Sequence, residues 1–220
     1  MIQSVNSFNI KSYRPMVKNS MAQKPFFMGD SQDSLGKADI SVHTGFSKDT
    51  FVGNLNGKEF NFKISENLLG KRTLSGTFNG KDFEIVDKSK GISGSFDGKP
   101  INIDIKSNMF SSKSEMVGTI GTTPLNLKVE DDTTRREITG KYDNKDLNVD
   151  IAIGVTKDSI QGEFDGEKIH LYSKSKGLFK NGADIYGDFE CPDELFLILL
   201  SSYYDTLHET NAMVAAAAMA

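Results

Sequence analysis

Apolar and polar residues alternate along most of this chain, in short arms that come in pairs. In residues 91–107, GISGSFDGKPINIDIKS, two alternating arms flank Asp97 and Gly98. Asp-Gly accepts the positive φ angles that a type I′ turn requires, so the stretch predicts a β-hairpin. A two-residue turn at this point places the apolar side chains of both arms on one face and the polar side chains on the other.

This hairpin pattern recurs six times. Each copy reads h-x-G-x-h, then a turn pair, then x-x-h-x-h, where h is apolar, and the marker glycines are spaced 18 to 24 residues apart: Gly53, Gly76, Gly94, Gly118, Gly140 and Gly162. The turn pairs all suit type I′ or II′ hairpins: Asn56-Gly57, Asn79-Gly80, Asp97-Gly98, Gly121-Thr122, Asp143-Asn144 and Asp165-Gly166. The marker glycine opposes a large side chain in every copy, so we expect it to make room for that side chain or to bend the strand.

Half-copies flank the six hairpins. Residues 37–44 read as a second arm without its first, and residues 183–190 read as a first arm without its second. The total predicts an all-β, antiparallel meander of about fourteen strands. An even number lets the first and last strands pair, so the meander either closes into a barrel or stays an open rolled sheet.

The apolar face of this sheet needs a cover, and the residues after the last strand offer one. Residues 195–200 are six consecutive apolar residues, and Pro192, Asp193 and Glu194 precede them in the pattern of a helix start. A helix that is apolar on nearly every side is typically buried. We therefore expect one apolar C-terminal helix that covers the apolar face or fills the barrel.

Three segments follow from these patterns. Residues 1–36 are polar and without a period, which predicts a mostly disordered tail, with a short docking segment at Phe26 and Phe27 as the alternative. Residues 37–190 form the hairpin-repeat domain, and residues 191–220 form the helix packed on it. The alanine-rich end at residues 213–220 is expected to be a frayed extension of that helix.

Composition narrows the partners and the compartment. The net charge is -4, with 26 basic and 30 acidic side chains interspersed, so nucleic acid is not an expected partner. No apolar run reaches the length of a membrane-spanning helix, and the first twenty residues do not resemble a secretory signal. The single cysteine, Cys191, excludes an intramolecular disulfide. These features predict a cytoplasmic protein.

The common signatures of chemistry are missing. His43, His170 and His208 lack metal-ligand spacing and are expected to be solvated. Cys191 precedes the helix, where a thiol can become reactive, but a half-buried structural cysteine is the expected role. We find no catalytic, cofactor-binding or metal motif, so the sequence predicts a protein that is not an enzyme and needs no cofactor.

Two stretches with some features of ligand loops are better explained as connections. Residues 118–124, GTIGTTP, fall on a hairpin turn and are not followed by the helix that a phosphate loop needs. The acidic residues 130–132 lie between the fourth and fifth hairpins, beside Arg135 and Arg136, and lack the spacing of a calcium site. This run is expected to be a solvated loop.

The polar face carries one ordered feature. Four copies place an asparagine at the same position, and Glu84 and His170 occupy that position in two others; the four are Asn61, Asn102, Asn126 and Asn148. This asparagine column could bind a polymer with a repeating unit, or could be left over from repeat duplication. Tyr172 is the exception on a face that otherwise lacks the aromatic platforms of sugar-binding proteins.

The first arm and its turn resemble part of the MORN repeat, a β-hairpin unit with an aromatic residue, a glycine and an NGK-like turn. The resemblance covers eight residues per copy, as in residues 74–81, LSGTFNGK. The turn comes one residue earlier than in that family, and alternating apolar residues replace the glycines of its second arm. The resemblance implies a hairpin unit and no assignment to the family.

The expected function is a non-enzymatic β-repeat scaffold or binding module for an unknown protein or polymer. The alternative is a carrier that holds an apolar small molecule inside the barrel, since large barrels can enclose cavities. An outer-membrane barrel is a third class, disfavoured because the alternating arms are shorter than membrane strands.

Overall fold

The computed structural model describes residues 37–44, 48–55, 57–67, 71–88, 90–107, 111–154, 157–173 and 185–218. All of them lie within the compact unit Ser34–Ala220. The tail at residues 1–36, with Phe26 and Phe27, lies outside the described residues.

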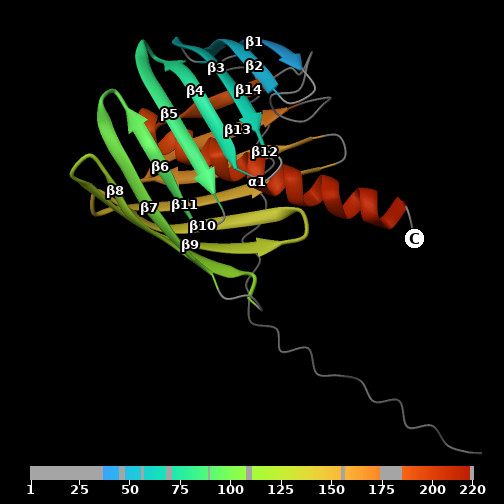
Figure 1. The fold of residues 1–220 in the computed structure, drawn as a ribbon. Coiled ribbons are helices and arrows are strands. Elements are labelled where there is room, and N and C mark those ends of the chain that lie inside the picture. The colour runs from blue at the N-terminus through green and yellow to red at the C-terminus, as the bar shows by residue number, and fades with distance from the viewer. Residues whose placement is uncertain are drawn as a thin grey trace, which may run out of the picture. The chain divides into compact units, whose positions relative to one another are not determined.

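The described residues form fourteen strands and one helix, and the strands make a closed antiparallel barrel in which sequential strands are neighbours (Figure 1). The strands are β1 (Lys37–Thr44), β2 (Lys48–Leu55), β3 (Lys58–Glu66), β4 (Arg72–Phe78), β5 (Lys81–Lys88), β6 (Gly91–Phe96), β7 (Lys99–Ser107), β8 (Lys113–Ile120), β9 (Thr123–Asp132), β10 (Arg135–Tyr142), β11 (Lys145–Ala152), β12 (Ser159–Phe164), β13 (Glu167–Ser173) and β14 (Ile185–Phe189). The predicted meander is confirmed.

The hairpin register is also confirmed. In β6–β7, Ile92 pairs with Ile103 and Gly94 with Ile101, as a two-residue turn requires. Asp97 and Gly98 both have positive φ angles, 49° and 73°, which is the geometry of a type I′ turn. Ile92 and Ile103 are buried, so the apolar face of the hairpin points into the barrel.

Pairing between β1 and β14 closes the barrel. Lys37 pairs with Tyr186 and Ala38 with Ile185, so the two half-copies supply the first and last strands as expected. Closure removes the free sheet edges, which would otherwise offer a template for aggregation.

Successive hairpins are staggered by two residues. Gly94 in β6 pairs with Ile101 in β7, whereas Gly118 in β8 pairs with Ile103, two residues further along the same strand. A constant stagger tilts the strands relative to the barrel axis and sets the diameter of the barrel.

The marker glycines permit neighbouring strands to approach closely. A Cβ at Gly94 would lie 1.9 Å from the Glu84 carbonyl oxygen, and one at Gly140 would lie 2.2 Å from the Asn126 carbonyl oxygen. Their φ angles are 146° and 145°, a region that residues with side chains rarely adopt. The backbone of the preceding strand, rather than the opposing side chain, is therefore what excludes a larger residue.

Helix α1 (Asp193–Ala218) runs through the bore of the barrel and continues beyond the strands (Figure 1). Each side chain from Leu195 to Leu200 is at most 2% exposed. The Phe196 ring stacks on Phe189 with 4.1 Å between ring centroids and on Phe78 with 5.3 Å. The expected apolar helix therefore fills the barrel, and each of these side chains gains roughly 1.5–3 kcal/mol from burial. Within the described part of the chain, no helix is both long and apolar enough to cross a membrane.

Carboxylates at the start of α1 attach it to the hairpin turns. Asp193 accepts hydrogen bonds from Lys58 at 3.0 Å, Asn79 at 3.1 Å and Lys81 at 2.9 Å. Burial alone would raise the pKa of Asp193, but these three donors hold that pKa below its usual value. The helix begins at Asp193 rather than Pro192, because the first backbone hydrogen bond runs from Phe196 N to the Pro192 carbonyl oxygen, at 3.0 Å.

Candidate functional site

The inner face of the barrel is not apolar throughout. Arg72, Asp87 and Arg136 are only 5%, 5% and 7% exposed, although each carries a charge. Each is two residues from an inward-facing apolar residue of its strand, Leu74, Ile85 and Ile138 respectively. The period of two therefore points these charges into the bore, a signal that the search for local motifs missed.

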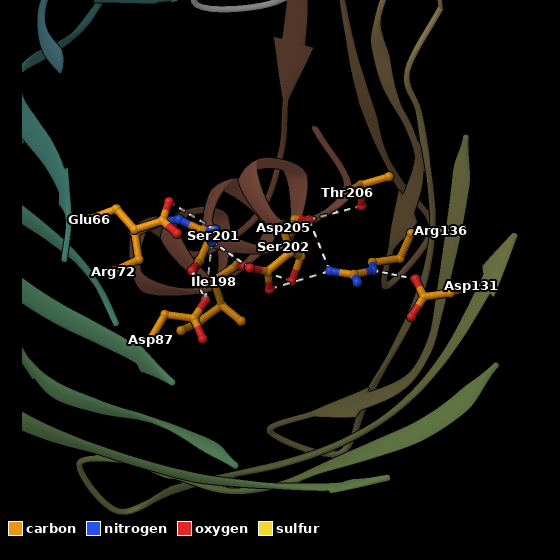
Figure 2. Close-up of polar contacts among 10 residues, drawn as sticks. All are labelled: Glu66, Arg72, Asp87, Asp131, Arg136, Ile198, Ser201, Ser202, Asp205 and Thr206. Carbon is orange, nitrogen blue, oxygen red and sulfur yellow. Dashed lines mark hydrogen bonds and ion pairs between the residues drawn. The ribbon is translucent and has the colours of Figure 1, made fainter. Parts of the chain in front are cut away.

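These residues meet α1 in what we call the inner polar cluster (Figure 2), made of Glu66, Arg72, Asp87, Asp131, Arg136, Ser201, Ser202, Asp205 and Thr206. Arg72 and Asp87 lie on one side of the helix, and Arg136 with Asp131 lies on the other. Arg72 Nη1 donates to Asp205 Oδ1, and Arg136 Nη1 donates to Asp205 Oδ2 at 3.4 Å. Asp205 thereby joins the helix to β4 and β10 at once.

Each arginine also has an acidic neighbour on the strand that precedes its own. Arg136 Nε donates to Asp131 Oδ1 at 2.5 Å, and Arg72 Nη2 lies 3.9 Å from Glu66 Oε2. The prediction of a solvated loop for residues 130–132 is wrong about the loop, because these residues belong to β9, whereas Glu130 and Asp132 are exposed as expected. Residues 130–136 form the ends of β9 and β10 and the two-residue turn between them, and Arg136 points inward.

Asp87 has the most perturbed environment in the inner polar cluster. Its Oδ2 accepts a hydrogen bond from Ser201 Oγ at 2.5 Å and lies 3.9 Å from Arg72 Nη1. Burial and the nearby negative charge of Asp205 raise the pKa of Asp87 to about 6, against the opposing effects of Ser201 and the two arginines. Asp87 therefore changes charge close to neutral pH.

We expect this titration to make stability depend on pH. A carboxyl group whose pKa is higher in the folded state binds protons more tightly there, so its contribution to the free energy of unfolding falls as pH rises from about 4 to about 6. Between pH 5 and pH 7.5, the stability of the wild type relative to Asp87→Asn should fall by about 1 kcal/mol. Urea unfolding of both proteins at the two pH values measures this difference.

The exposed Asp82, on the same strand, supplies the control for that measurement. Asp82→Asn should retain the pH dependence of the wild type. Identical pH dependence in the wild type and Asp87→Asn would show that Asp87 does not titrate in this range.

Beside the inner polar cluster lies a cavity of about 340 Å³, which we call the end cavity. It lies between α1 and the strands from β4 to β10, and its lining residues are Arg72, Asp87, Lys88, Ile92, Ile105, Ser114, Met116, Val129, Arg136, Ser202 and Asp205. Its volume is within the range of small-molecule sites. Its aliphatic lining comes from β6 to β9, and its charged lining comes from β4, β5, β10 and α1.

One donor beside the end cavity is unused. The Arg72 side chain is 7% exposed, and its Nε has no hydrogen-bond partner among the described residues. Buried donors are nearly always satisfied, by protein, water or a ligand. The Nε–Nη2 edge of Arg72 is therefore the place in the cluster where an external acceptor would bind once the Glu66 side chain, 3.9 Å from Nη2, moves aside.

We compared the chain with known proteins by sequence and by structure. No protein-family model, curated protein or solved structure matches it significantly. The function is therefore inferred from the end cavity and its lining.

The asparagine column lies where the repeat places it. Asn61, Asn102, Asn126 and Asn148 are all exposed on the outer wall, on β3, β7, β9 and β11. They are not part of the end cavity. Their role in binding a polymer stays a prediction.

On the outer wall near β13, Tyr172 and His170 are more buried than the sequence predicted. Tyr172 is only 4% exposed and stacks on both His170 and Tyr186, with centroid separations of 5.2 and 5.7 Å, so it is not an open platform. His170 is half-buried rather than fully solvated, and burial, followed by the charge of Lys157, lowers its pKa. The side chains of His43 and His208 lie outside the described residues.

Cys191 fits the structural role. Its side chain packs against the apolar core, and burial raises the pKa of its thiol to about 12, far from the range of reactive thiolates. Among the described residues, no group of three or more histidine, cysteine or acidic side chains is arranged to hold a metal ion.

Proposed function

We propose that this protein is a non-enzymatic binding module that holds a small molecule in the end cavity. The observation that carries this proposal is a cavity of about 340 Å³ lined by aliphatic side chains of β6 to β9 and by charged side chains of β4, β5, β10 and α1. Ligand sites of small molecules commonly combine an apolar lining with a few placed polar groups. The barrel and its internal helix act as the rigid frame of this site.

The packing of the bore limits what the ligand can be. The helix fills the middle of the barrel with residues 195–200, so an apolar carrier would use the end cavity rather than the centre of the bore. The charged side of the cavity favours a molecule that also has a polar group, because buried charges need partners. The ligand is therefore small and amphipathic.

A filled-cavity variant tests this function. Ile105 is partly buried, lines the end cavity and packs on the core, so Ile105→Phe should occupy ligand space with little effect on the fold. We expect the full-length wild type, purified without denaturation from its natural host, to release a small molecule detected by mass spectrometry. Ile105→Phe should release at least about tenfold less, because blocking contacts worth 1.4 kcal/mol already has that effect.

Ile153→Phe makes the same change at a core residue that does not line the cavity, and it should retain the ligand. Equal amounts of every extracted compound from the wild type and Ile105→Phe, with both proteins folded, would contradict a ligand in the end cavity.

A further inference from the structure

The chemistry of the end cavity is divided between its two sides. The aliphatic side is formed by Ile92, Ile105, Met116 and Val129, from β6 to β9. The charged side carries Arg72 and the other ionisable residues of β4, β5, β10 and α1. A ligand that satisfies both sides needs a short hydrocarbon part and one polar end.

The cavity volume sets the length of that hydrocarbon part. At about 30 Å³ per non-hydrogen atom, the share of one water molecule in the liquid, a cavity of about 340 Å³ holds about ten such atoms. This corresponds to a medium-length aliphatic chain with one head group.

The sign of the lining charges favours a negative head group. Three cationic side chains line the cavity, Arg72, Arg136 and the exposed Lys88, against two carboxyl groups, Asp87 and Asp205. Glu66 and Asp131 also contact the arginines, but they do not line the cavity. With Asp87 protonated the whole set is neutral, and once Glu66 moves away from Arg72 the remaining set carries one positive charge that a negative head group can balance.

The geometry of Arg72 indicates where that charge would bind. Its Nη1 is used by Asp205, whereas its Nε is unpartnered but shielded from solvent, and its Nη2 lies 3.9 Å from Glu66 Oε2. The Glu66 side chain, which is 33% exposed, has to swing away before a ligand can reach this edge. An Nε–Nη2 edge matches the two oxygens of a carboxylate.

We propose that the end cavity binds a medium-chain aliphatic carboxylate, with its carboxylate on the Nε–Nη2 edge of Arg72 and its chain along Ile92, Ile105, Met116 and Val129. This inference rests on the proposed function, because it names the ligand class of the same cavity.

A head-group series tests the ligand class. Octanoate, octanol and octylammonium share one chain and differ in charge, and each can be titrated into the full-length protein at pH 6. The methyl NMR signal of Met116, which lines the cavity, reports binding there. We expect octanoate to bind at least about tenfold more tightly than octanol, as a charge-assisted hydrogen bond predicts, and more tightly still than octylammonium.

Two pairs of variants, each with a control, test where the hydrocarbon chain and the carboxylate of the ligand bind. Ile105→Phe should abolish octanoate binding, and Ile153→Phe should retain it. Lys88→Gln should weaken binding about two- to threefold, since it removes one partly screened charge from the lining. Lys90→Gln removes the same charge from an exposed residue that does not line the end cavity, and it should have no effect.

The pH dependence of binding is a second readout. Asp87 faces Asp205, Ser201, Arg72 and Arg136, and its ionisation above pH 6 adds a negative charge beside the ligand. Octanoate should therefore bind several-fold more weakly at pH 7.5 than at pH 6, and Asp87→Asn should remove this difference.

The outcomes separate the ligand class from the proposed function. If octanol or octylammonium binds as tightly as octanoate and Ile105→Phe blocks all three, the carboxylate inference is wrong and the cavity still binds ligands. If none of the three shifts the Met116 signal, the carboxylate inference is likewise wrong, and the comparison of extracted ligands decides the proposed function. Octanoate binding that survives in Ile105→Phe would also overturn the inference.

Discussion

Gly94→Ala is expected to destabilise the barrel by about 3 kcal/mol or more. The new Cβ would lie 1.9 Å from the Glu84 carbonyl oxygen and 2.9 Å from its carbonyl carbon. Neither backbone atom can move without breaking the pairing of β5 with β6. Alanine is also strained at a φ of 146°. Urea unfolding, followed by circular dichroism, measures the loss.

Gly98→Ala is the matched control for this prediction. Gly98 also has a positive φ, 73°, but a Cβ there would meet nothing within 4 Å. The turn variant should therefore lose only about 1 kcal/mol, the usual cost of alanine in the left-handed region. If the two variants lose equal stability, backbone conformation alone explains the marker glycine and the close approach of the strands does not matter.

Removal of α1 is expected to abolish the folded barrel. A chain that stops after Pro192 loses the side chains from Leu195 to Leu200, which fill the bore. At roughly 1.5–3 kcal/mol for each, their burial matches or exceeds the whole net stability of a typical domain. The truncated chain should lack a cooperative unfolding transition and should bind a dye specific for exposed apolar surface.

A chain that stops after Glu209 is the control for the helix deletion. It keeps the bonds of Asp193 to the hairpin turns and the bonds of Asp205 to both arginines. This shorter deletion should retain a cooperative transition. A stable, monomeric barrel without any of α1 would show that the strands can pack their inner side chains against one another.

The strands and their register could be predicted because two independent signals agree. The alternation of apolar residues fixes which face of each arm is buried, and turn pairs such as Asp97-Gly98 fix which residues lie opposite. A shift of the register by one residue would place Ile92 and Ile103 on the solvent-exposed face of the sheet. Closure and the place of the helix inside the bore could not be predicted, because they depend on the meeting of β1 with β14.

The candidate site was missed for a physical reason as well. Arg72, Asp87 and Arg136 lie far apart in the chain and form no local motif, and only the closed barrel brings them around one helix. Their inward position could have been read by extending the period of two to the ends of the strands. The cavity itself depends on how far side chains fill the space beside α1, which a pattern of residue types does not encode.

With a constant two-residue stagger, the number of repeats sets the diameter of the barrel, and that diameter has to match the thickness of the helix inside it. The barrel has fourteen strands, and its girth grows with every hairpin added. Loss of one hairpin would reduce the diameter of the barrel by about a seventh, roughly 4 Å. The helix and its leucine side chains would then no longer fit inside. Gain of one unit would leave a gap along the whole helix. Repeats in this architecture can therefore diverge in sequence, but their number cannot change unless the central helix changes with them.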